Sequence, residues 1–104
     1  KMLDAPPVQP EFEDTEIATC YTSDLLSDVM ANAGDATVLI TIQAHKNSVA
    51  VASLNDISAI VLCNDRPVPE DMREAAAEEG IAILVTAKNQ FQVSGLLYAE
   101  LNAD

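Results

Sequence analysis

Basic residues, glycine and cysteine are all scarce in this chain of 104 residues. Only five Lys and Arg stand against seventeen Asp and Glu, which gives a formal net charge of −12. A chain so acidic repels phosphate backbones and anionic lipid headgroups, so we expect neither nucleic-acid binding nor membrane binding. No apolar run approaches the ~20 residues that span a bilayer, and the sequence therefore predicts no transmembrane helix.

The few glycines and cysteines exclude several kinds of site. Gly34, Gly80 and Gly95 cannot form a G-x-G-x-x-G turn or a Walker A loop, which removes the usual nucleotide cradles. Cys20 and Cys63 cannot build a disulfide scaffold and lack the close spacing of metal ligands. We therefore expect no cofactor and no metal. The first twenty residues carry acids and prolines rather than a basic and apolar leader, and we expect a cytoplasmic protein.

The chain divides into an arm and one domain. Residues 1–16 combine prolines with acids and show little apolar periodicity, which predicts a flexible acidic arm. Residues 17–104 alternate short β-branched runs with helical patterns, and Gly80 and Asn89 suit the end of one helix and the N-cap of another. The predicted strands are 17–21, 37–42, 57–63 and 81–85, each followed by a helix. This β-α-β-α-β-α-β-α order predicts an α/β domain of three layers, with a mainly parallel four-stranded sheet and helices on both faces.

Polar loops follow the strands, where ligands bind in open parallel sheets. Lys46, Arg66 and Lys88 all fall in these loops, as does the single histidine. This concentration of basic residues in the loops of an acidic chain suits the binding of a small anion by helix N-termini and cationic side chains. A polar, solvated edge is the competing interpretation. The candidate ligand-binding residues are Gln43, His45, Lys46, Asn47, Asn64, Arg66 and Lys88.

A catalytic constellation is not evident in the sequence. His45 is the one residue suited to general-base work near neutral pH. A nucleophile would have to be a cysteine or a serine, and no spacing recommends any of them. We therefore assign no catalytic residues and expect a protein that is not an enzyme.

The last helix offers a surface for association. Its apolar residues extend beyond one stripe, from Phe91 to Leu101. A glycine within a helix costs ~1 kcal/mol relative to alanine and often permits close backbone approach. The candidate homodimer interface is therefore Val93, Ser94, Gly95 and Leu97. Ordinary packing within one chain remains the alternative for these positions.

Residues 21–101 resemble the DRTGG domain family, most clearly its short stand-alone members. The resemblance lies at residues 23–30 (SDLLSDVM), 40–45 (ITIQAH), 47–54 (NSVAVASL) and 78–84 (EEGIAIL). It implies an α/β module that is often dimeric and that accompanies CBS domains in regulated pyrophosphatases or occurs in phosphotransacetylases. Some stand-alone members are labelled HPr serine kinases, but this chain lacks a phosphate-binding loop. The five residues that name the family fall on Ala44-His45 and Cys63-Asn64-Asp65, so none of them is kept.

Two functional hypotheses follow. The first is a non-catalytic regulatory or assembly module that acts as a homodimer and through protein partners. A redox or phosphotransfer enzyme is the partner that the resemblance suggests. The second is a sensor that binds a small phosphorylated metabolite or nucleotide-like anion at the carboxyl ends of the strands.

Overall fold

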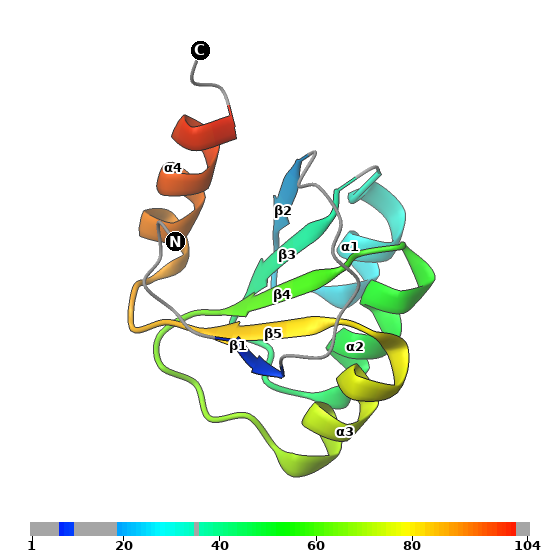
Figure 1. Cartoon of the computed structure of the whole chain (residues 1–104). Coiled ribbons are helices and arrows are strands. Elements are labelled where there is room, and N and C mark those ends of the chain that lie inside the picture. Colours follow the sequence, from blue (N-terminus) through cyan, green and yellow to red (C-terminus); the bar gives the residue numbers. More distant parts are fainter. Residues whose placement is uncertain (1–6, 10–18, 35, 102–104) are drawn as a thin grey trace.

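The computed structural model describes residues 7–9, 19–34 and 36–101 (Figure 1). Strands and helices alternate from residue 20 onward, and this order confirms the α/β prediction. The strands are β1 (Pro7–Gln9), β2 (Cys20–Thr22), β3 (Val38–Thr41), β4 (Ala59–Leu62) and β5 (Ala82–Val85). The helices are α1 (Leu26–Asn32), α2 (Lys46–Leu54), α3 (Glu70–Glu79) and α4 (Gln90–Leu101).

The sheet has the order β1-β5-β4-β3-β2. Strands β2 to β5 are all parallel, and their register aligns Val38 with Ala59 and Ala59 with Ala82. The parallel four-stranded core of the sheet is thus confirmed. None of the helices in the described ranges is long and apolar enough to cross a membrane.

Strand β1 adds a feature that the sequence analysis does not predict. Residues Pro7–Gln9, within the segment taken as a flexible arm, pair antiparallel with β5 at the edge of the sheet, in an irregular register. Proline is tolerated in such an edge strand because its missing N–H need not join a ladder. The remaining residues of that arm lie outside the described part of the chain.

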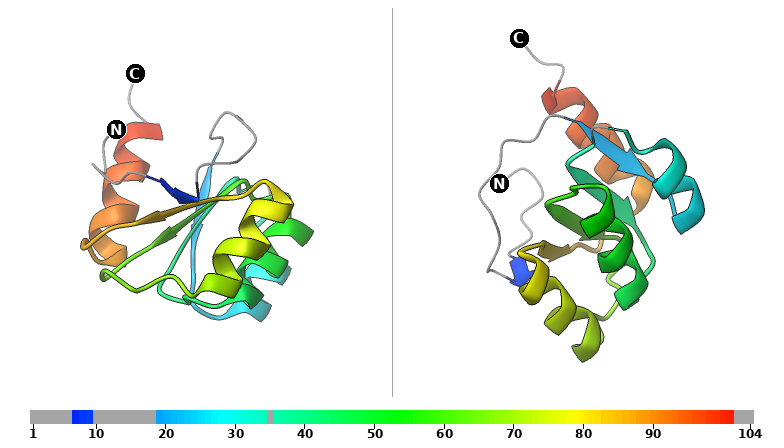
Figure 2. Two further views of the ribbon diagram at one scale, coloured as in Figure 1. Left: turned by 60° about the horizontal axis from the view of Figure 1, so that its bottom comes forward. Right: turned by 90° about the vertical axis from the view of Figure 1, so that its right-hand side faces the viewer.

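The helices are divided unequally between the two faces of the sheet. Each crossover from β2 to β5 moves to the next strand in the same direction, so right-handed connections place α1, α2 and α3 on one face. Helix α4 follows β5 and lies on the other face, against β2 and β3 (Figures 1 and 2). The predicted three layers are therefore present, with three helices in one outer layer and one in the other.

Two apolar clusters match these layers. The larger one packs side chains such as Leu39, Ile60 and Ile83 against the three helices. The smaller one lies beneath α4 and consists of Val38, Ile40, Val61, Cys63, Val93 and Leu97. Alternate strand residues supply the two clusters because successive side chains of a strand point to opposite faces.

Candidate functional site

The carboxyl edge of the sheet is organised around Asp24, which follows β2. Its Oδ1 accepts hydrogen bonds from Thr41 Oγ1, the Ile42 backbone N–H and Gln90 Nε2, each at 2.9 Å. These bonds join the β2–α1 loop to the end of β3 and to the first residue of α4. Asp24 therefore positions α4 on the sheet.

The first group of predicted ligand residues lies in the β3–α2 connection, beside Asp24. Gln43 donates from Nε2 to the Asp24 carbonyl at 3.0 Å. His45 is the N-cap of α2, and its Nδ1 accepts the Asn47 backbone N–H at 3.0 Å. The histidine thus caps this helix, and its cap bond uses an N–H group that an anion would need. Lys46 and Asn47 are exposed in the first turn.

The second group lies after β4 and β5. Strand β4 leads to α3 and β5 leads to α4, on opposite faces of the sheet. A crevice commonly opens between the loops that follow two such neighbouring strands. Here the loops bond to each other instead: the Asn64 N–H donates to the Lys88 carbonyl at 3.0 Å and the Asp65 N–H to the Thr86 carbonyl at 2.8 Å. Arg66 is exposed beyond them. The backbone donors best placed to cradle an anion are therefore already satisfied.

The three cations lie at the same edge of the sheet. Lys46, Arg66 and Lys88 follow β3, β4 and β5, and parallel strands end on the same side. In the described ranges, however, no hydrogen bond or ion pair joins the two groups of ligand candidates, and the carboxylate of Asp24 stands at the same edge.

Both cysteines are thiols with little nucleophilic character. Burial, together with the charge of Asp24, raises the pKa of the Cys63 thiol to about 11. Burial also raises the pKa of Cys20. Because the thiolate is the reactive form, neither side chain has the environment of a catalytic cysteine. The described residues contain no group of three or more His, Cys, Asp or Glu that could hold a metal ion.

Helix α4 is fixed to the sheet along one face. Asn89 and Gln92 form a reciprocal cap, with 2.9 Å bonds from Gln92 N–H to Asn89 Oδ1 and from Asn89 N–H to Gln92 Oε1, as predicted for Asn89. Ser94 Oγ lies 2.7 Å from Thr22 Oγ1 of the edge strand β2. Val93 and Leu97 are 0% and 5% exposed, inside the smaller cluster.

The opposite side of α4 is exposed and apolar. Phe91 is 86% exposed and Tyr98 is 73% exposed. Gly95 lies between them, so the spacing i, i+4, i+7 places all three on one face of the helix. A Cβ atom added at Gly95 would have no described atom within 4 Å apart from its chain neighbours and the backbone of its own helix. We call Phe91, Gly95 and Tyr98 the aromatic face of α4.

This geometry corrects the predicted interface. Val93 and Leu97 pack against the chain's own sheet, and Ser94 bonds to Thr22, so only Gly95 of the four candidates lies on the exposed face. Phe91 and Tyr98 were not among the predicted interface residues, although their heptad spacing around Gly95 is a usable signal. Asp24 was not predicted either, because its hydrogen-bond partners are distant in the chain.

Comparison with models of known protein families and with curated proteins finds no match for this chain.

Proposed function

We propose that this protein is a non-catalytic regulatory and assembly module that forms a homodimer through the aromatic face of α4. The observation that carries the proposal is the exposed triplet Phe91, Gly95 and Tyr98. Full burial of a side chain of this size contributes about 1.5–3 kcal/mol, and a two-fold dimer would bury two from each copy. Helix α4 has this apolar face in addition to the one that it needs for its own sheet.

The charge of the chain favours a second copy at this face. Two molecules that each carry a net charge of −12 repel one another over most of their surfaces. Helix α4 contains a single charged residue, Glu100, near its end. The aromatic face therefore lets two copies approach without placing carboxylates opposite each other.

The spacing of the triplet fits two-fold symmetry. If two α4 helices cross antiparallel at Gly95, Phe91 of one copy lies against the partner subunit's Tyr98. The glycine, which nothing in the described part of its own chain requires, then allows the helix backbones to approach closely. The resemblance to DRTGG domains, which are often dimeric, supports the same arrangement.

The size of this face sets the expected affinity. Stable interfaces bury ~1,200–2,000 Å² in total, and two helices of 12 residues reach only the lower end of that range. We therefore expect a dissociation constant in the micromolar range that falls as salt screens the repulsion between the copies.

Sedimentation velocity over a wide concentration range tests the proposal. Phe91→Glu should raise the dissociation constant roughly 30-fold or more, because it places a charged carboxylate against the partner subunit's Tyr98 at two positions per dimer. Leu54→Glu is the matched control, since Leu54 is 72% exposed at the end of α2 in the other layer. A wild-type chain that stays monomeric, or a control that weakens association as strongly, would contradict the proposal.

A further inference from the structure

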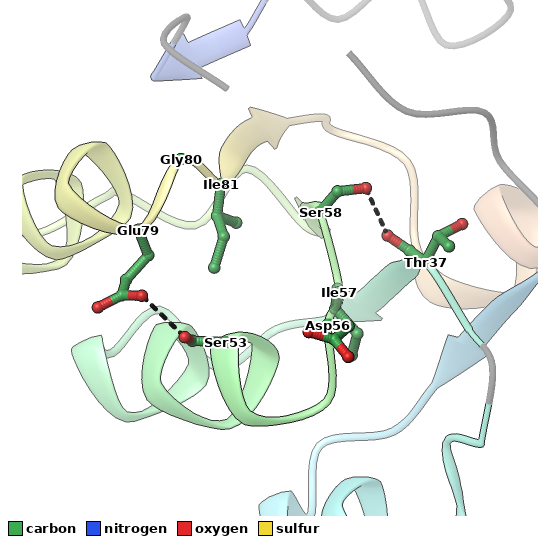
Figure 3. Close-up of a pocket in the computed structure, with 8 residues that line it drawn as sticks. All are labelled: Thr37, Ser53, Asp56, Ile57, Ser58, Glu79, Gly80 and Ile81. Carbon is green, nitrogen blue, oxygen red and sulfur yellow. Dashed lines mark hydrogen bonds between the residues drawn. The ribbon is translucent and has the colours of Figure 1, made fainter. Parts of the chain in front are cut away.

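A cavity of about 350 Å³ lies at the amino edge of the parallel strands, at the opposite end of the sheet from Lys46, Arg66 and Lys88. It is lined by the ends of α2 and α3 and by the turns that lead into β3, β4 and β5. Figure 3 shows Glu79 and Ile81 on one side, and Ser53 and the turn at Asp56 and Ile57 on the other. Its volume falls within the ~300–1,000 Å³ of small-molecule sites.

The lining combines an apolar base with acceptors at the rim. Ile57 and Ile81 are each 2% exposed, whereas the carboxylates of Asp56 and Glu79 are exposed to solvent. Ser53 Oγ donates to Glu79 Oε1 at 2.8 Å and thereby orients this carboxylate (Figure 3). The second carboxylate oxygen can accept further hydrogen bonds from a ligand.

The backbone adds negative potential to the same cavity. Both α2 and α3 end here, and neither has a basic residue in its last turn. A helix C-terminus carries a partial negative charge, so two helix ends and two carboxylates favour a cation. Among the described residues, no Lys, Arg or His lines the cavity, and Arg73 pairs with Glu70 in the first turns of α3, away from its C-terminal end.

We propose that this cavity binds a small free alkylammonium compound, such as an aliphatic diamine. One ammonium group contacts Glu79 and the other contacts Asp56, which lie on opposite sides of the cavity, and the methylene chain spans the distance between them. A metal ion is the poorer occupant, because the described residues offer no group of three or more ligating His, Cys, Asp or Glu side chains. The site is separate from the aromatic face of α4 and does not depend on dimerisation.

Isothermal titration of the whole chain with putrescine tests this inference at low ionic strength. Glu79→Gln removes the charge and keeps an oxygen that can accept from Ser53. Asp56→Asn is conformationally matched, since Asp56 has a φ of 59° and asparagine tolerates this region. Each variant should weaken binding roughly fivefold, the scale of one exposed ion pair.

Glu78→Gln is the control, because it removes the same charge from an exposed neighbour that does not line the cavity. It should leave putrescine affinity unchanged, and the uncharged analogue butanediol should not bind. Equal weakening by Glu78→Gln would mean diffuse attraction to an acidic chain and would overturn the site, as would absence of putrescine binding. The Phe91→Glu variant should bind putrescine with unchanged affinity. The putrescine titration therefore tests this site even if the protein does not form the proposed dimer.

Discussion

Helices α3 and α4 differ far more on their outward sides than on their inward sides. Each buries a short apolar pair: Met72 and Ala76 for α3, Val93 and Leu97 for α4. Outward, α3 presents a charged surface made of Glu70, Asp71, Arg73, Glu74, Glu78 and Glu79. Helix α4 instead presents Phe91 and Tyr98. The residues on the inward side of each helix match the sheet that they pack against. The residues on the outward side match what surrounds the helix, which is water for α3 and, as we propose, a second copy of the chain for α4.

The two helices also rest on clusters of different size. Helix α3 shares its layer with α1 and α2, whereas α4 has no other helix of the described ranges beside it on the other face (Figure 2). A helix without lateral neighbours loses its anchoring when one buried side chain is truncated. We therefore expect α4 to open locally more readily than α3.

The largest expected effect follows from removing one anchor from each helix. Leu97→Ala and Met72→Ala should each lower the free energy of unfolding by about 2–5 kcal/mol, measured by urea denaturation. Leu97→Ala should also speed thiol labelling of Cys63 under native conditions by more than its loss of global stability explains, in a Cys20→Ser background. Cys63 is 0% exposed beneath α4, and its pKa of about 11 keeps it protonated at neutral pH.

Labelling of Cys63 thus separates local opening of α4 from global unfolding. In Met72→Ala, the labelling rate should follow the global unfolding equilibrium. If Cys63 labelling is accelerated equally in both variants at equal stability, α4 is held as firmly as α3. The proposed difference between the two helix layers would then be wrong.

The sequence was sufficient for features that depend on neighbours in the chain. The later strand runs, the helix end at Gly80 with its φ of 69°, and the cap at Asn89 are all local, and all are confirmed. The first predicted strand, 17–21, is confirmed at Cys20 and Tyr21, and its residues 17 and 18 lie outside the described part of the chain. Strand β1 was not predictable in this way. Three residues beginning with proline have no periodicity of their own, and they form a strand only because β5 offers an edge.

The candidate site depended on long-range placement that no local pattern encodes. Asp24 bonds to Thr41 and Gln90, which lie 17 and 66 positions away in the chain. Helix α4 carries apolar side chains on several sides, so its sequence could not decide which side faces the sheet. That ambiguity is why Val93 and Leu97 were assigned to an interface, although they belong to the core.

A smaller effect is expected at Gly95. Gly95→Ala should raise the free energy of unfolding of the monomer by about 0.5–1 kcal/mol, because alanine favours the helix and the site is open. The same change should weaken the dimer, since added methyl groups separate the two backbones. Urea denaturation in the monomeric Phe91→Glu background measures the first effect, and sedimentation of Gly95→Ala alone measures the second. If Gly95→Ala leaves the dissociation constant of the dimer unchanged, the contact between the two copies does not include Gly95.

The smallest effect concerns the ion pair on the charged side of α3. Arg73 Nη1 lies 3.8 Å from Glu70 Oε1, with side-chain exposures of 48% and 71%. Water screens such a pair, so a double-mutant cycle with Arg73→Ala and Glu70→Ala should give a coupling energy below about 0.5 kcal/mol. A coupling above ~1 kcal/mol would show that the charged surface of α3 contributes to stability. The outward sides of both helices would then have structural roles, and the contrast with α4 would rest on its exposed aromatic side chains alone.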